Sequence, residues 1–141
     1  MRARLRIAVL CLGIVELLVG LFLMWERHQG GVVACPVGGS GCTTVQHSRW
    51  AVFLGIPVST LGVIGALALI GAALWRRSEA ALVAFAIAAV GAGFSLYLTW
   101  LEANRIHAYC AWCLASMTIW IICAGLTGVA AWRATSAAPT P

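Results

Sequence analysis

The stretch AALVAFAIAAVGAGFSLYLTWL, residues 80–101, contains no charged side chain and decides the fold class. A helix that crosses the hydrocarbon core of a bilayer needs about 20 mostly apolar residues, and this stretch supplies them. The whole chain has the same character, since 62% of its 141 residues are hydrophobic and 9% are charged. Soluble globular domains average about 25% charged residues. The sequence therefore predicts an all-α membrane protein, and it excludes a cytosolic enzyme, a disordered chain and a nucleic-acid-binding protein.

Four apolar segments are long enough to cross the bilayer, and we expect one integral membrane domain over residues 1–141. The predicted transmembrane helices cover residues of about 5–25, 50–75, 80–101 and 110–132. A long outer loop, residues 26–49, separates the first two helices. The tail, residues 133–141, has the polar, Pro-containing composition of a disordered segment. The expected architecture is a four-transmembrane-helix bundle with a long outer loop.

The distribution of the basic residues predicts the orientation of the bundle. All nine are arginines, and short loops that carry more of them face the cytoplasm. One side of the bundle has Arg2, Arg4, Arg6, Arg76, Arg77 and Arg133, and the other side has Arg27, Arg49 and Arg105. Both termini are therefore expected in the cytoplasm, with the long loop and the short loop before residue 110 outside.

The six cysteines divide by their depth in the predicted helices. Cys11 and Cys123 fall inside the first and fourth helices, where they are expected to be small apolar packing residues. The other four fall at the outer face: a C-x6-C pair in the long loop, and a C-x-x-C pair where the fourth helix begins. These are Cys35, Cys42, Cys110 and Cys113.

The C-x-x-C pair indicates redox chemistry. Paired cysteines outside the cytoplasm meet an oxidising compartment and form disulfides. A bridge between Cys110 and Cys113 closes a very small loop and constrains the unfolded chain little, so its value is chemical. Unpaired N–H groups at a helix start favour the thiolate, which is both a nucleophile and a good leaving group. No metal site is expected, because no second pair of ligands matches this one.

The loop pair permits two interpretations. Gly38, Gly39 and Gly41 lie between Cys35 and Cys42 and allow that segment to move. Residues 43–50, TTVQHSRW, favour a short amphipathic helix on the membrane surface, with a cysteine at its start. In the first interpretation, the loop pair moves and carries electrons between a soluble donor and the C-x-x-C pair. The alternative is a static disulfide that staples the loop.

One face of the third helix lies level with the C-x-x-C, at a depth that a membrane quinone reaches. At helical spacing this face carries Phe94, Tyr97, Leu98 and Leu101. Taken one at a time, each of these residues is explained by ordinary packing between helices. Together with the fourth helix, the face is a candidate wall of a quinone pocket.

These motifs resemble the bacterial form of the vitamin K epoxide reductase family. The residues that match are the four outer cysteines, Ser48-Arg49-Trp50, Leu54-Gly55-Ile56-Pro57-Val58-Ser59 and Tyr109-Cys110-Ala111-Trp112-Cys113. The resemblance covers residues of about 5–132. It implies a four-helix bundle around a quinone, ubiquinone or menaquinone, with Cys113 as the quinone-facing thiol and Ser48 as the hydroxyl residue near the site.

The resemblance also implies an electron path. Electrons pass from a reduced thioredoxin-like exported protein to Cys35 and Cys42, then to Cys110 and Cys113, and then to the quinone. The chain ends nine residues after the last predicted helix, so we expect the thioredoxin-like partner to be a separate protein.

Two departures from the animal enzymes change the expected reaction. The animal Thr-Tyr-Ala run after the C-x-x-C is replaced here by residues 114–118, LASMT, of which Met117 is an expected quinone contact. The animal active-site Asn near the second helix has no counterpart, since Asn104 is the lone asparagine. We therefore expect quinone-linked disulfide formation, not epoxide reduction.

The sequence thus predicts a monomeric disulfide–quinone oxidoreductase in a bacterial inner membrane, surrounded by lipid, with no nucleic-acid partner. Glu16 supports a different class of function. A carboxylate at mid-membrane depth is costly and marks a functional site by default. A small proton-coupled four-helix transporter that uses Glu16 is the alternative.

Overall fold

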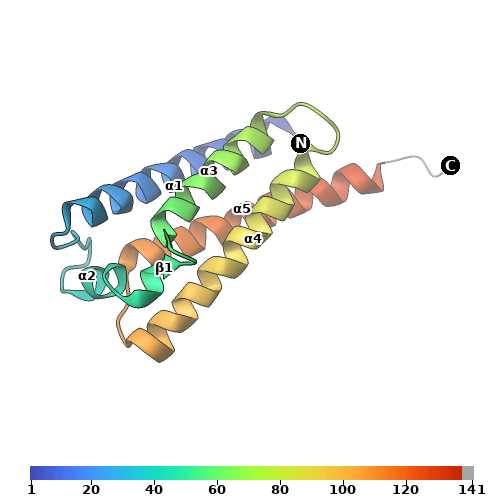
Figure 1. Ribbon diagram of the computed structural model, residues 1–141. Coiled ribbons are helices and arrows are strands. Elements are labelled where there is room, and N and C mark those ends of the chain that lie inside the picture. Colours follow the sequence, from blue (N-terminus) through green and yellow to red (C-terminus); the bar gives the residue numbers. More distant parts are fainter. Residues whose placement is uncertain (138–141) are drawn as a thin grey trace.

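The computed structural model describes residues 1–137, and most of them lie in four long helices that run side by side (Figure 1). These helices are α1 (Ala3–Gln29), α3 (Val58–Leu74), α4 (Ala80–Leu101) and α5 (Ala111–Ser136). Helix α1 packs mainly on α3, and α4 packs mainly on α5. The N-terminus, the α3–α4 turn and the end of α5 lie at one end of the bundle, and the short helix α2 (Gly41–Gln46) lies at the other.

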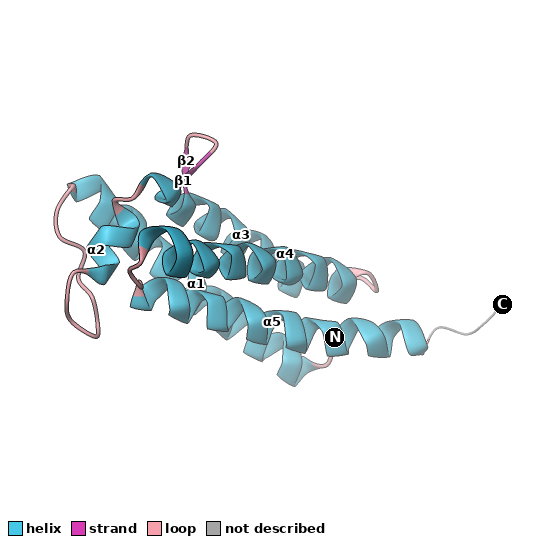
Figure 2. Cartoon of the chain, turned by 90° about the horizontal axis from the view of Figure 1, so that it is seen from below, coloured by secondary structure: helices cyan, strands magenta, loops and turns pink. Residues whose placement is uncertain are grey.

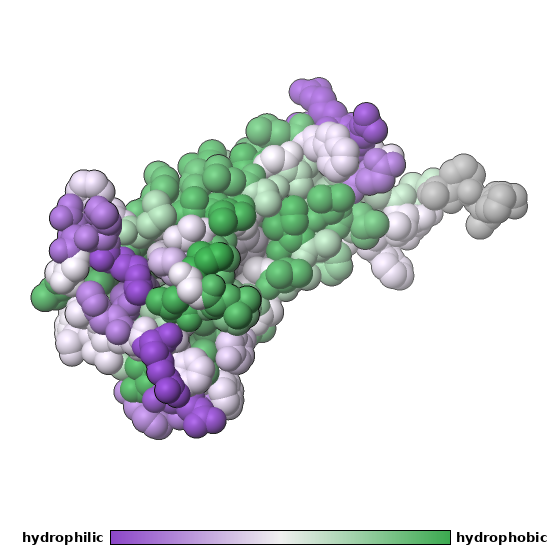
Figure 3. All heavy atoms as spheres, viewed as in Figure 1, coloured by the Kyte–Doolittle hydropathy of each residue, from purple (hydrophilic) through white to green (hydrophobic). Residues whose placement is uncertain are grey.

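The outer surface of the bundle is apolar along its length. Three helices are long and apolar enough to cross a membrane: α1, α5, and α4 with its continuation to Ile106. Large apolar side chains such as Leu18, Ile64 and Val90 are exposed on them. Figure 3 shows this surface as a green belt with hydrophilic residues gathered at the two ends. An apolar exterior of this kind suits lipid and not water, so the chain is a multi-pass all-α membrane protein.

Helix α3 is shorter than the other three. Its 17 residues reach about 26 Å at about 1.5 Å per residue, slightly less than a hydrocarbon core of about 30 Å. The expected helix from residue 50 is wrong at its start, because residues 49–57 form a 3₁₀ turn (η1, Arg49–Ala51) and a two-stranded hairpin. The hairpin pairs β1 (Val52–Phe53) with β2 (Ile56–Pro57) and protrudes from the bundle (Figure 2).

Local backbone chemistry explains why the helix starts late. Leu54 and Gly55 both have positive φ, of 51° and 80°, which is the geometry of a two-residue hairpin turn. Pro57 then disfavours helical geometry at the residue before it and can only precede or begin a helix. Helix α3 therefore starts at Val58.

Small residues let α4 and α5 approach closely. Ala84, Ala88 and Ala92 recur along one face of α4 and pack against Trp120 and Cys123 of α5. A side chain at Gly91 would run into the Trp120 ring, so this position requires glycine. Close approach over small residues is the usual way in which membrane helices associate. Cys123 is a buried packing residue as expected, whereas Cys11 is exposed on α1 and does not pack inside the bundle.

The helix ends also differ from the expected ones. Helix α1 continues to Gln29 and stops at Gly30, whose φ of 67° ends the helix in the left-handed region. Helix α5 continues through residues 133–136, so the expectation of a disordered tail is wrong there, because Ala134 favours helix and the segment continues the packed helix. Residues 138–141, which that expectation also covered, lie outside the described residues.

Candidate active site

The four outer cysteines come together at the end of the bundle that carries α2. Cys42 of α2 and Cys110, directly before α5, are fully buried in one cluster of side chains. Cys35 and Cys113 pack against the same cluster. Residues separated by up to 78 positions in the sequence thus form a single group of sulfur atoms, with the loop pair on one side and the C-x-x-C pair on the other.

Close contacts hold the loop against the start of α5. A side chain on Gly41 would overlap the carbonyl oxygen of Tyr109, so glycine is required where α2 meets the residue before Cys110. The Trp112 indole N–H donates to the carbonyl of Ala34 at 2.7 Å. The Arg27 guanidinium donates to the carbonyl of Gln46 at 2.6 Å. These contacts fix Cys42 beside Cys110.

The two cysteine pairs are in different redox states. Cys35 and Cys42 form a disulfide with their Cα atoms 5.6 Å apart, while Cys110 and Cys113 are free thiols. The two loop sulfurs differ in access, since Cys42 is fully buried and Cys35 is partly exposed. A soluble protein thus reaches Cys35 more readily, and Cys42 faces inward.

Cys110 is the more acidic thiol of the C-x-x-C pair. Its pKa is lowered to about 7, mainly because the Cys113 thiol donates a hydrogen bond to its sulfur. The backbone N–H of Cys113 and the side-chain amide of Gln46, whose Nε2 lies 3.8 Å from the Cys110 sulfur, lower the pKa further. Burial and the negative charge of Glu102 oppose this shift. A thiol of this pKa is a good leaving group near neutral pH.

We expect the first thiolate of the reduced protein to form near pH 7 and to be Cys110. Ultraviolet thiolate absorbance measured against pH should show this step in the wild type and lose it in Cys110→Ala. Gln46→Leu should move the step to higher pH, because it removes a donor to the sulfur. Gln29→Leu, at the exposed end of α1, is the matched control and should leave the step in place. An unchanged step in Gln46→Leu would contradict the assignment.

Glu102 is a buried carboxylate next to the thiols. It begins a π-helical turn (Glu102–Ile106) that continues α4. Its Oε2 accepts the backbone N–H of Cys110 at 3.0 Å, and its Oε1 is buried without a hydrogen-bond partner among residues 1–137. One oxygen of Glu102 therefore holds the backbone of Cys110. The other oxygen is free and lies near Cys113, where it can accept a proton.

A small cavity joins this carboxylate to Cys113. Its volume is about 30 Å³, which is enough for a water molecule. The polar side chains around it are those of Gln46, Ser48, Glu102 and Cys113. Gln46 donates to the Cys113 sulfur at 3.5 Å, and the Ser48 hydroxyl donates to the carbonyl of Val45 at 2.7 Å.

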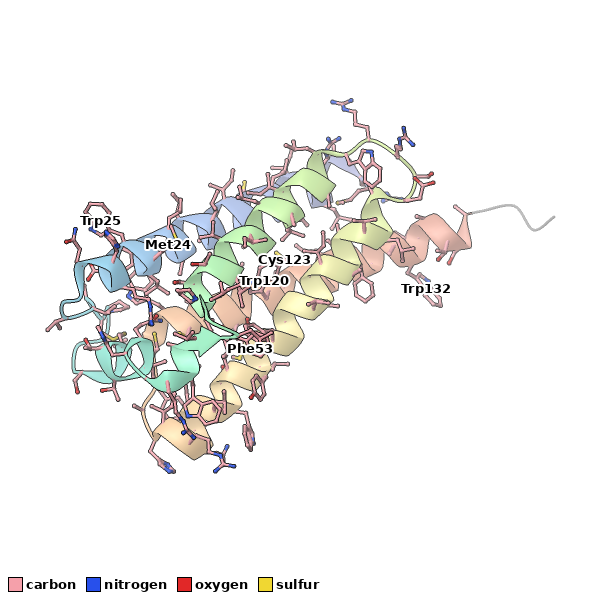
Figure 4. The ribbon with its side chains drawn as sticks, viewed as in Figure 1. Met24, Trp25, Phe53, Trp120, Cys123 and Trp132 are labelled. Atoms are coloured by element: carbon pink, nitrogen blue, oxygen red, sulfur yellow. A yellow bond between two sulfur atoms is a disulfide. The ribbon has the colours of Figure 1, made fainter. Side chains whose placement is uncertain are left out.

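A much larger cavity extends from Cys113 between the helices. Its volume is about 680 Å³, within the range of about 300–1,000 Å³ usual for sites that bind small organic molecules. Its walls are mostly apolar and come from all four long helices and the β1–β2 hairpin. Figure 4 labels two lining residues, Trp120 and Phe53, in the middle part of the bundle. Its polar lining residues are Glu16, Gln46, Ser59, Ser95 and Ser116.

The structure brings some of the expected quinone contacts to this cavity and not others. Phe94 and Cys113 line it, and Leu101 lines the small cavity beside it. Among the described residues, Tyr97 and Met117 line neither cavity. Tyr97 stacks on Trp100 with ring centroids 6.5 Å apart, and the Met117 sulfur accepts the Thr99 hydroxyl at 3.3 Å.

Sequence reasoning missed Gln46 and Glu102 as members of the site. Glu102 gave a signal, because it is the single charged residue at the end of an uncharged span and lies eight positions before Cys110. Nothing in the sequence marks Gln46, since a glutamine in a polar loop is common. Its role depends on the folded position of α2.

A comparison with protein families agrees with the geometry. The model of the vitamin K epoxide reductase family matches residues 7–128. The match includes all four clustered cysteines, Gln46, Ser48 and Glu102, and it reaches into α5 beyond the large cavity. A match over most of the chain, together with the thiol cluster beside an apolar cavity, establishes that this protein belongs to the vitamin K epoxide reductase family.

Proposed function

We propose that the protein is a disulfide–quinone oxidoreductase that oxidises a thioredoxin-like exported protein and supports disulfide bond formation. Membership of the family supports an oxidoreductase, and enzymes of the family use quinones. The observation that carries the proposal is the single cluster of four cysteines, one of which, Cys113, lines a cavity of about 680 Å³. This arrangement offers a path for electrons from an accessible disulfide to a buried apolar chamber.

The large cavity suits a quinone. Its apolar walls match a ring with an isoprenoid tail. Two of its lining residues each have a buried polar atom without a partner among the described residues: Oε2 of Glu16 and Oγ of Ser59. Buried polar atoms normally have hydrogen-bond partners, so this pair suits a ligand that carries oxygen atoms. A bound ubiquinone or menaquinone would supply an acceptor for two electrons and two protons. Cys113, Phe94 and Leu98 are the residues we expect against its ring.

The first exchange reduces the loop pair. A thiolate of the partner attacks the Sγ of Cys35, the more accessible sulfur, and Cys42 leaves as a thiolate. The second thiol of the partner then attacks the mixed disulfide, so the partner is oxidised and Cys35 and Cys42 are both reduced. Two electrons have moved onto the loop.

The second exchange passes those electrons inward. With Cys110 and Cys113 oxidised to a disulfide, the Cys42 thiolate attacks the Sγ of Cys110 and releases Cys113. Cys35 then attacks Cys42, which re-forms the loop disulfide and releases Cys110. The pKa of about 7 makes Cys110 a good leaving group at this point. The resulting state has an oxidised loop pair and a reduced C-x-x-C pair, as in the structure.

Re-forming the Cys110–Cys113 bond releases two electrons and two protons and completes the cycle. Cys113 is the thiol that lines the large cavity, so its sulfur delivers the electrons. Glu102 lies across the small cavity and accepts the proton of Cys113. Gln46 keeps the sulfur oriented through its hydrogen bond.

We further propose the cellular setting that this chemistry needs. Helix α3 serves as a fourth span, both termini lie in the cytoplasm, and the cysteine cluster faces the outside of a bacterial inner membrane. Six arginines on the side of the termini against three on the side of the cluster support this orientation. The protein acts as a monomer in the lipid, with its partner as a separate chain.

A coupled assay tests the function. The purified protein is mixed with a reduced thioredoxin-like exported protein and menadione, and quinone reduction and partner thiols are followed together. We expect one quinone to be reduced for every two thiols lost. If the partner thiols stay reduced, the proposed function is wrong, and transport through Glu16 becomes the leading account.

A further inference from the structure

Glu16 is the titratable group in the large cavity that the relay of thiols does not use. It lies in the middle of α1 and is 3% exposed. Its Oε1 accepts two hydrogen bonds, from the Ser116 hydroxyl at 2.5 Å and from the Trp120 indole N–H at 2.9 Å. Both donors are on α5, within two turns of Cys113. Glu16 therefore belongs to the same chamber as the inner thiol, which argues against a separate transport function.

The other oxygen of Glu16 has no hydrogen-bond partner among the described residues. Oε2 is buried, and the Glu16 side chain to which it belongs lines the large cavity. The described residues also place no cation in an ion pair with it. An unpaired carboxylate charge in an apolar chamber is costly, so the neutral acid is the favoured form, with its hydrogen on the free oxygen. A carboxylic acid in this form has one O–H group free to donate to a ligand beside it.

The helix geometry places this donor below the reacting sulfur. Ser116, which is bonded to Glu16, lies three residues after Cys113 and so about 4.5 Å deeper along the axis of α5. A para-quinone has carbonyl oxygens on opposite sides of its ring. Because Cys113 and Glu16 line the same cavity, a ring that meets Cys113 with one side can present the opposite oxygen to Glu16.

We propose that Glu16 is a catalytic residue that hydrogen-bonds the distal quinone carbonyl through Oε2 and supplies it with a proton. This inference rests on the proposed function and adds the proton donor that the thiols do not provide at that oxygen. The balance is closed: the two thiols lose two electrons and two protons, and the S–S bond forms. Glu16 gives one proton to the acceptor and regains one of the two released, and the other released proton completes the second hydroxyl.

Two substitutions separate binding from proton transfer. Glu16→Gln keeps an oxygen for Ser116 and Trp120 and keeps an N–H donor toward the cavity, but it carries no transferable proton. Glu16→Leu removes the donor altogether. Glu79→Gln, at the exposed α3–α4 turn, is the matched control.

Binding is measured on the fully oxidised protein by equilibrium dialysis with menadione, so that no turnover occurs. We expect Glu16→Gln to bind within about twofold of the wild type and Glu16→Leu to bind about tenfold more weakly, as for the loss of one hydrogen bond. Wild-type affinity in Glu16→Leu, or a loss in Glu16→Gln as large as in Glu16→Leu, overturns the proposal.

Proton transfer is measured in a single turnover of the reduced protein with saturating menadione. We expect Glu16→Gln to slow this reaction by about a hundredfold, the lower range for loss of a general acid. Exchange between an external dithiol and the Cys35–Cys42 disulfide should stay at the wild-type rate, which also shows that the variant folds. An unchanged turnover in Glu16→Gln overturns the proposal. If the wild type itself does not reduce menadione, the proposed function fails before the variants are compared.

Discussion

Cys113→Ala should lower quinone-dependent thiol oxidation to background, a loss on the order of a thousandfold or more, as when the residue that forms a covalent intermediate is removed. Cys113 is the thiol of the C-x-x-C pair that lines the large cavity. Without it, Cys110 has no sulfur with which to re-form the inner disulfide. The loop disulfide is unaffected, so a reduced partner should still exchange once with Cys35 and Cys42. The measurement is the coupled assay of menadione reduction and partner thiols, together with the single exchange step.

The matched control for this variant is Cys123→Ala. Cys123 is also a buried cysteine of α5, but it packs against the small face of α4 and does not line either cavity. We expect its activity to stay within about threefold of the wild type, with the modest stability loss of a small cavity in the core. Equal losses in the two variants would mean that Cys113 acts through packing and not through its thiol.

Glu102→Leu should have the second largest effect, because the substitution both lowers the stability of the fold and removes a proton acceptor from the proposed mechanism. The Cys110 backbone N–H loses its acceptor and remains buried, which costs about 1–3 kcal/mol of stability. Cys113 loses the carboxylate across the small cavity. We expect a lowered unfolding temperature in detergent and a fall in turnover of about 100- to 10,000-fold, the range for loss of a general base.

Glu102→Gln separates the two roles of this residue. The amide oxygen still accepts the Cys110 N–H, so stability should stay near that of the wild type. The amide takes up no proton, so turnover should still fall by about a hundredfold or more. Full activity in Glu102→Gln would assign Glu102 a structural role alone and contradict its part in the mechanism.

The class of the protein and the four cysteines that cluster at the end of the bundle can be predicted from the sequence. Apolar segments such as residues 80–101 leave little choice of fold in a bilayer, because every backbone group must be paired within a helix. The spacing of Cys110 and Cys113 before an apolar helix predicts reactive thiols by local chemistry alone. These features depend on residues close together in the chain.

What the sequence did not predict depends on contacts between distant segments. Cys42 meets the start of α5 because Gly41 leaves room for the Tyr109 carbonyl, and that fit is visible only after folding. Gln46 reaches sulfur atoms more than 60 positions away. Helix periodicity placed Tyr97 on the same face as Phe94, but the cavity wall follows the packing of four helices and leaves Tyr97 outside. The cost of a carboxylate in a membrane marks Glu16 in the sequence, but its position in the same cavity as Cys113 depends on the packing of α1 against α5.

In the proposed electron path, Cys42 and Cys110 are the two sulfurs that join the loop pair to the C-x-x-C pair. The most direct test traps that bond by removing both thiols that would resolve it, in the double variant Cys35→Ala/Cys113→Ala. After mild oxidation, digestion and mass spectrometry without reduction, we expect a Cys42–Cys110 disulfide in most of the protein. The matched variant Cys42→Ala/Cys113→Ala should form little Cys35–Cys110 disulfide, because Cys35 lies on the exposed side of the loop. If neither variant forms its bond, or if the Cys35–Cys110 bond forms as readily, the proposed electron path is wrong.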